Sequence, residues 1–277
     1  MEIMPAASIS GEIVLPGDKS ISHRAAILAS IAEGVTRVHN FSGSADCHAT
    51  LECLRRLGVE ISQTAADVIV TGVGKSGFSP PAAALDCGNS GTTMRLLCGL
   101  LAGQDFESVL TGDESLQKRP MGRVIAPLGE MGAVIESCGG FAPLTIHGRS
   151  PLRAASITPE FASAQVKSAI LLAGLNSNGN TSVIETTQTR DHTERMLRWL
   201  GAAVDVEIID GGMRLTVSGD ATLAGRDITV PSDISAATFF AIAAACLPDS
   251  EILMKGVGVN ASRRAILDVL IRFGANI

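Results

Sequence analysis

Residues 17–24 read Gly-Asp-Lys-Ser-Ile-Ser-His-Arg, and this stretch predicts a loop that opens a helix. It follows Pro16 and a roughly alternating segment, residues 7–15, which is typical of a strand. An apolar run then extends from Ala25 to Ala32. Because this helix is apolar nearly all round, we expect it to be buried in the core.

The start of this helix gathers groups that suit an anion. Lys19, Ser20 and Arg24 cluster there, beside the free N–H groups and the positive end of the helix dipole. A lysine supplies a point charge and an arginine a planar fork, which together favour phosphate or carboxylate. The alternative is a solvated helix start with two isolated charges, and these eight residues alone do not decide between the two.

The same order of elements recurs four times: a polar helix start, a buried helix, a strand, an amphipathic helix, and a glycine followed by another strand. The recurrences run from Lys19 to Gly58, from Ser90 to Gly132, from Gln165 to Gly201 and from Asp233 to Gly274. A period of about 40 residues is a sign of a repeat architecture. The sequence therefore predicts an α/β fold of repeated βαβαββ units.

Two of the expected amphipathic helices have defined limits. One spans Lys118 to Met131, and the other spans Ser262 to Phe273. The second places Ala265, Ile266, Val269, Leu270 and Phe273 on one apolar face.

Three of the buried helices begin with polar residues that fit an anion: 19–20, 89–92 and 163–165. If the units pack around a shared axis, these helix starts converge on one cleft. Such a cleft could hold a ligand with several negative charges, although the protein as a whole is acidic.

Bulk properties exclude several functions. The 277 residues are 46% hydrophobic and carry a net charge of −6, which argues against a general nucleic-acid binder. Six cysteines form no Cys-x-x-Cys pair and no metal-ligand spacing, which fits a reducing cytoplasm. We also expect no metal and no cofactor. No apolar run is long enough for a membrane span. We expect His23, His48 and His192 to have surface or capping roles.

Several segments in order resemble one family, the 5-enolpyruvylshikimate-3-phosphate synthases, also called 3-phosphoshikimate 1-carboxyvinyltransferases. They are LPGDKSISHRA (15–25), LDCGNSGTTMR (85–95), LTGDESLQKRPM (110–121), ASAQVKSA (162–169) and TRDHTERML (189–197). The resemblance implies transfer of the carboxyvinyl group of phosphoenolpyruvate to the 5-hydroxyl of shikimate 3-phosphate, with release of phosphate. It also implies two similar domains of three units each, and a protein that is usually monomeric.

The resemblance further implies the roles of ten residues. For shikimate 3-phosphate it implies contacts by Lys19, Ser20, Arg24, Ser163, Gln165 and Arg190. For phosphoenolpyruvate it implies contacts by Asn89, Gly91, Arg95 and Arg119, together with Lys19 and Gln165. Both substrates are anions, which fits a site of cations and helix starts.

The domain limits follow from the same comparison of units. We expect residues 14–227 to form a complete three-unit domain. Residues 1–13 would supply a strand to a second domain, of which residues 228–277 form the first unit. The fourth unit stops at Ile277, where its next strand should begin, and this predicts a chain without its C-terminal third.

The family's acid–base residues lie downstream of Ile277, so no residue of this chain is assigned as a catalytic acid or base. We therefore expect the chain alone to be inactive or nearly so. Two alternatives stay open. One is a non-catalytic protein that binds shikimate 3-phosphate. The other is the related transferase acting on UDP-N-acetylglucosamine, whose family has Lys-Asn where this chain has Lys19-Ser20 and uses a loop cysteine that residues 112–119 lack.

Overall fold

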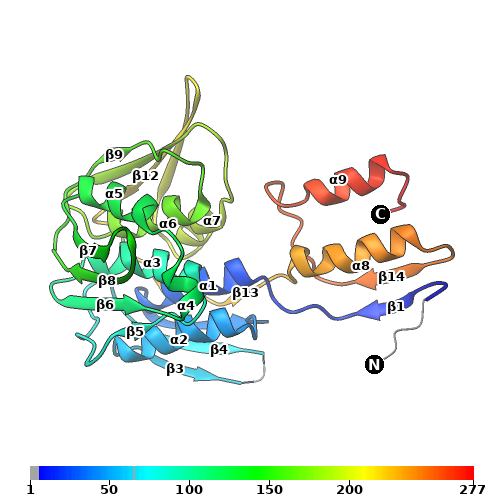
Figure 1. The fold of residues 1–277 in the computed structure, drawn as a ribbon, viewed down its shortest axis with the longest axis horizontal. Coiled ribbons are helices and arrows are strands. Elements are labelled where there is room, and N and C mark those ends of the chain that lie inside the picture. The colour runs from blue at the N-terminus through cyan, green and yellow to red at the C-terminus, as the bar shows by residue number, and fades with distance from the viewer. Residues whose placement is uncertain (1–5, 65) are drawn as a thin grey trace.

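A computed structural model describes residues 6–64 and 66–277 of the chain (Figure 1). The helices are α1 (Lys19–Ser30), α2 (Ala45–Arg56), α3 (Gly91–Ala102), α4 (Glu114–Gln117), α5 (Gly122–Glu130), α6 (Ala164–Gly174), α7 (His192–Trp199), α8 (Ile234–Cys246) and α9 (Ala265–Arg272). The strands are β1 (Ser10–Ile13), β2 (Glu33–His39), β3 (Glu60–Gln63), β4 (Val68–Val73), β5 (Leu85–Asp86), β6 (Glu107–Thr111), β7 (Val134–Cys138), β8 (Phe141–His147), β9 (Ser156–Ile157), β10 (Asn180–Glu185), β11 (Val204–Ile209), β12 (Gly212–Ser218), β13 (Ile228–Thr229) and β14 (Glu251–Met254).

Three sheets have the same topology. Their strand orders are β13-β2-β4-β3, β5-β6-β8-β7 and β9-β10-β12-β11. In each sheet the short first strand is parallel to its neighbour, and the other two pairs are antiparallel. Each unit also carries one buried and one amphipathic helix, so the predicted α/β fold of repeated βαβαββ units is confirmed.

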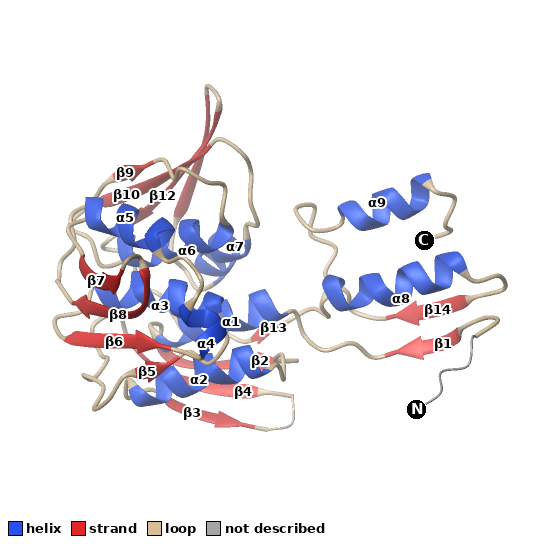
Figure 2. Ribbon diagram, viewed as in Figure 1, coloured by secondary structure: helices blue, strands red, loops and turns tan. Residues whose placement is uncertain are grey.

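The buried helices α1, α3 and α6 lie in the middle of this body, with the strands around them (Figure 2). Every residue of α1 from Ser22 to Ser30 is buried, as its all-round apolar sequence predicts. Helices α3 and α6 pack especially closely, because a β-carbon on Gly99 would lie 2.2 Å from the carbonyl oxygen of Ala169. Only glycine fits that contact, and it allows the backbones of the two helices to lie close together.

A smaller group of elements lies at the other end of the molecule (Figure 1). There β1 pairs in parallel with β14, from Ser10 opposite Glu251 to Ile13 opposite Met254, with α8 beside the pair and α9 on the far side of α8. This parallel pair corresponds to β13 and β2 in the larger body. The domain limits expected at residues 13/14 and 227/228 stay a prediction, although β13 (Ile228–Thr229) pairs with β2 inside the larger body and not with the smaller group.

The chain passes twice between the two groups, and the two passages are hydrogen-bonded to each other. The N–H of Asp18 donates to the carbonyl of Pro231 (2.8 Å), and the N–H of Asp233 donates to the carbonyl of Pro16 (2.9 Å). These bonds fix the approach of the chain to the first residue of α1.

Some local expectations were wrong. The helix expected over residues 118–131 begins only at Gly122 and follows the separate α4, because the residue before Pro120 is disfavoured in a helical conformation. The helix expected over residues 262–273 begins at Ala265, and only Leu270 of its apolar face is buried. In the described part of the chain, no helix has the length and apolarity needed to cross a membrane.

Candidate anion-binding site

The three buried helices begin at side-chain caps. The carboxylate of Asp18 accepts from the N–H of Ile21 (2.9 Å) at α1, and the hydroxyl of Ser90 accepts from Thr93 (3.1 Å) at α3. At α6 the hydroxyl of Ser163 accepts from the N–H of Val166 (3.4 Å). Each cap satisfies one of the free N–H groups of its helix start, and at α1 the cap is itself a carboxylate.

At α1 the candidate residues have different environments. The Lys19 ammonium lies 2.9 Å from Asp46 and is about half exposed. The hydroxyl of Ser20 accepts from the Arg190 guanidinium (3.2 Å). Arg24 is only 3% exposed, and its nitrogens donate to Thr193, to Ser168 and to the carbonyl of Ser20. Arg24 therefore ties α1 to α6 and α7, and burial lowers its pKa to about 10.

Two further candidate residues join α3 to α6. The Arg95 guanidinium donates to the side-chain carbonyl of Gln165 (2.8 Å), and the amide of Gln165 donates to the hydroxyl of Thr92 (2.8 Å). These bonds hold the starts of the two helices in a common surface. Beside them Arg119 donates to the side-chain carbonyl of Asn89 (2.6 Å).

Positive charges are crowded at these helix starts. Burial lowers the pKa of Arg95, and the like charges of Arg119 and Arg123 lower it further. Burial likewise lowers the pKa of Arg190, and the charge of Arg263 is the next cause. Because cations that repel one another are relieved by a bound anion, this electrostatic pattern favours an anionic ligand.

Two hollows lie beside these cations. One of about 510 Å³ lies at the start of α6, and it is lined by residues 162–165, Gln188, Thr189, Arg190, Ser262 and Arg263. Another of about 670 Å³ is lined by residues 113–115, Lys118 and Arg119. The described residues contain no group of three or more His, Cys, Asp or Glu side chains that could hold a metal ion.

Direct contacts link eight of the ten candidate residues into three sets. The sets are Ser20, Arg24 and Arg190; Gly91, Arg95 and Gln165; and Asn89 with Arg119, while Ser163 caps the helix that carries Gln165. Lys19 contacts Asp46 instead.

Sequence reasoning missed three partners of these residues. They are Asp46, Thr193 and Ser168, and each lies far along the chain from the residue that it holds. No local pattern marks such long-range pairs. His23 is fully buried against Thr50, so a surface or capping role for it was wrong.

Fold and site together define a class of protein: an α/β chain of repeated units in which arginines gather at the starts of buried helices, beside hollows that could hold an anion. Comparison with known families identifies the family within this class. Residues 3–277 match the model described as EPSP synthase (3-phosphoshikimate 1-carboxyvinyltransferase), and the chain belongs to this family.

Individual relatives agree with that assignment. The chain is 52% identical to a 3-phosphoshikimate 1-carboxyvinyltransferase of Geobacillus kaustophilus, over 98% of this chain and 63% of the relative. It is 50% identical to the one of Solibacter usitatus, over 99% of this chain and 64% of the relative. The EPSP synthase structure from Acinetobacter baumannii superposes with a TM-score of 0.89 at 45% identity, over 97% of this chain and 60% of that one. The chain thus spans somewhat less than two thirds of the length of these relatives.

Proposed function

We propose that this chain forms the shikimate 3-phosphate side of a carboxyvinyltransferase. The whole protein would move the carboxyvinyl group of phosphoenolpyruvate to the 5-hydroxyl of shikimate 3-phosphate and release phosphate. The observation that carries the proposal is the crowding of Arg95 with Arg119 near the start of α3, and of Arg190 with Arg263 beside the hollow at the start of α6. Membership in the EPSP synthase family supports the identity of the two anions.

The proposed roles follow the geometry of the three helix starts. The shikimate phosphate would be held by Ser20, Ser163, Gln165 and Arg190, with Arg24 behind them. Phosphoenolpyruvate would lie nearer α3, and its contacts would be Asn89, Gly91, Arg95 and Arg119. Lys19, which is about half exposed, would contact both substrates after exchanging its partner Asp46 for ligand oxygens.

These residues bind and orient, and none of them is assigned a proton-transfer role. Proton transfer by a positioned group is commonly worth about 10²–10⁴-fold in rate. We therefore predict that the chain binds shikimate 3-phosphate but turns over little or not at all. A phosphate-release assay with both substrates measures this, and turnover like that of an intact enzyme of the family would contradict it.

Calorimetric titration of the chain with shikimate 3-phosphate tests the binding site directly. We expect Lys19→Met to lower the affinity about ten-fold, because a charge-assisted contact contributes about 1.5–3 kcal/mol. Arg37→Ala is the matched control, since Arg37 is an exposed arginine on β2, away from the three helix starts. Equal affinity in the wild type and Lys19→Met would refute the proposed role of Lys19. Absence of binding in the wild type would refute the function.

Two alternatives predict other outcomes. A purely non-catalytic binder would give binding without any phosphate release, even when the acid–base residues of the family are supplied by a longer chain. A transferase acting on UDP-N-acetylglucosamine is not favoured, because the relatives reported above are named 3-phosphoshikimate 1-carboxyvinyltransferases. A cytoplasmic location and a monomeric state remain predictions.

A further inference from the structure

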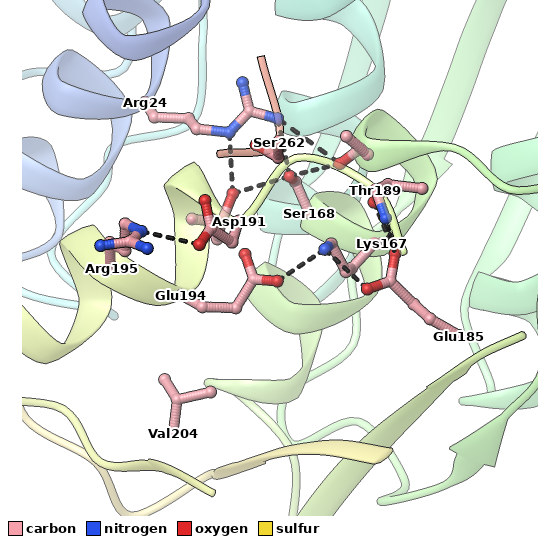
Figure 3. Close-up of polar contacts among 12 residues, drawn as sticks. Arg24, Lys167, Ser168, Glu185, Thr189, Asp191, Glu194, Arg195, Val204 and Ser262 are labelled. Atoms are coloured by element: carbon pink, nitrogen blue, oxygen red, sulfur yellow. Dashed lines mark hydrogen bonds and ion pairs between the residues drawn. The ribbon is translucent and has the colours of Figure 1, made fainter. Parts of the chain in front are cut away.

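Lys167 lies on α6 two residues after Gln165, yet it does not face the ligand hollow as a free cation. It is 1% exposed, and its ammonium lies 2.9 Å from Glu185 and 2.6 Å from Glu194 (Figure 3). Both carboxylates are buried as well. A buried charge needs such partners, and the group as a whole carries one more negative than positive charge when both carboxyls are ionised.

Glu185 connects this buried lysine to the surface. One of its oxygens accepts from Lys167, and the other accepts from the N–H (3.2 Å) and the hydroxyl of Thr189. Glu185 is the last residue of β10, so these bonds fasten the turn over residues 186–191 at its base (Figure 3).

Arg190 is the residue that this fastened turn presents to the hollow. Its guanidinium donates to the hydroxyl of Ser20 (3.2 Å) and lines the hollow beside Gln165. Within residues 6–64 and 66–277, no carboxylate forms an ion pair with Arg190. The guanidinium therefore keeps donors for a ligand, while its position depends on the turn beneath it.

Glu194, the other carboxylate partner of Lys167, supports the turn over residues 186–191 from its opposite end. Lys167 pairs with Glu194 of α7, and the hydroxyls of the adjacent Ser168 and Thr193 lie 2.7 Å apart. These two neighbouring links join α6 to the first turn of α7, which directly follows the turn over residues 186–191. Arg24 donates to both hydroxyls (Figure 3).

We infer that Lys167, Glu185 and Thr189 are positioning residues that hold Arg190 in place for the phosphate of the ligand. The inference rests on the proposed function. It adds that the affinity of the site depends on a chain of three residues, of which Lys167 and Glu185 are buried, and none of the three is a proposed ligand contact. Lys167 then positions the site through Glu185 and does not itself contact the ligand.

Thr189→Val in the full 277-residue chain is the first test, because it removes one hydroxyl from a partly exposed residue and spares the core. We expect the affinity for shikimate 3-phosphate to fall about five-fold, which is the loss of one modest hydrogen bond. Thr189→Ser restores the hydroxyl and should restore the affinity. Thr187→Val is the matched control in the same turn, and it should bind like the wild type. Equal affinity in Thr189→Val and the wild type would overturn the inference.

A double-mutant cycle separates positioning from a general structural effect. If Thr189 acts through Arg190, then Thr189→Val should cause no further loss in an Arg190→Ala background. Losses that add up would mean that the hydroxyl acts elsewhere, and would overturn the inference.

A ligand-free measurement keeps this inference distinct from the proposed function. We expect the ¹⁵N order parameter of the Arg190 Nε to exceed that of the exposed Arg37, and to fall to a similar value in Thr189→Val. An unchanged order parameter would overturn the inference even if shikimate 3-phosphate binds. Conversely, a wild type that shows the expected order but binds no shikimate 3-phosphate would overturn the proposed function alone.

Discussion

Gly91 occupies the first turn of α3, where a β-carbon would meet two guanidinium groups. It would lie 2.8 Å from a nitrogen of Arg95 and 3.4 Å from a nitrogen of Arg119. The Arg95 side chain is flexible at that end, so the backbone can accept alanine, but the Arg95 guanidinium must move and the Arg119 guanidinium comes into contact with the added carbon. The glycine therefore sets where these charges point.

We expect Gly91→Ala to lower the affinity for phosphoenolpyruvate about ten-fold, or about 1.4 kcal/mol, because the displaced Arg95 guanidinium and the neighbouring Arg119 are proposed contacts. Calorimetry in the presence of saturating shikimate 3-phosphate measures the change. Gly129→Ala on α5 is the matched control: nothing lies within 4 Å of its added carbon, and it should only stabilise the fold, by roughly 0.5–1 kcal/mol. Unchanged affinity in Gly91→Ala would show that the two arginines do not define the phosphoenolpyruvate site.

At the scale of elements, a buried chain of hydrogen bonds links α1, α2 and α3. His23 Nδ1 lies 2.7 Å from the hydroxyl of Thr50, which lies 2.7 Å from the hydroxyl of Thr93. Thr93 in turn donates to Ser90, the cap of α3 (2.7 Å). The Nε2 atom of His23 is buried and has no hydrogen-bond partner among the described residues, so the neutral ring is favoured.

The buried His23 predicts that the folded protein loses stability in acid. Burial lowers the pKa of His23 in the folded state to about 3, from an ordinary 6.5. Between about pH 6.5 and pH 3, His23 is protonated in the unfolded chain and neutral in the folded chain. The free energy of unfolding therefore falls as the pH falls through this range. At pH 5 the loss due to His23 is about 2 kcal/mol.

Urea unfolding at pH 7.5 and pH 5.0 measures this effect. We expect the wild type to lose about 2 kcal/mol more than His23→Asn between the two values, since the other titrating groups contribute equally to both proteins. The asparagine keeps a hydrogen-bonding group beside Thr50. Equal losses in the two proteins would show that His23 is not held neutral.

Elements also show how far the sequence alone could lead. The buried helices were predictable, because α1, α3 and α6 are apolar runs that follow polar caps. The break before α5 and the burial of His23 were not. The first depends on a proline whose effect is local and easily outweighed, and the second depends on Thr50, which is brought to His23 only by packing. The same holds for the Lys167–Glu185 pair, whose residues lie on different elements.

At the scale of the whole molecule, the two groups of elements differ in how much apolar surface they bury. Helix α1 buries every residue from Ser22 to Ser30, whereas α8 buries only Ile234, Ala237 and Ala241. Phe239 of α8 is 75% exposed, and Phe273 after α9 is 88% exposed. A two-stranded sheet with so few buried contacts has little free energy holding it closed.

Hydrogen exchange followed by mass spectrometry should therefore show different exchange rates in the two groups of elements. We expect amides of α8 and β14 to exchange at least about 100-fold faster than those of α3 and α6, which corresponds to about 2.7 kcal/mol less opening free energy. The reason is that opening the small group exposes little new apolar surface, while opening α3 from α6 separates the core. Peptides from α3 serve as the internal reference. Uniform protection across all four elements would mean that the chain unfolds as one cooperative unit despite its uneven burial.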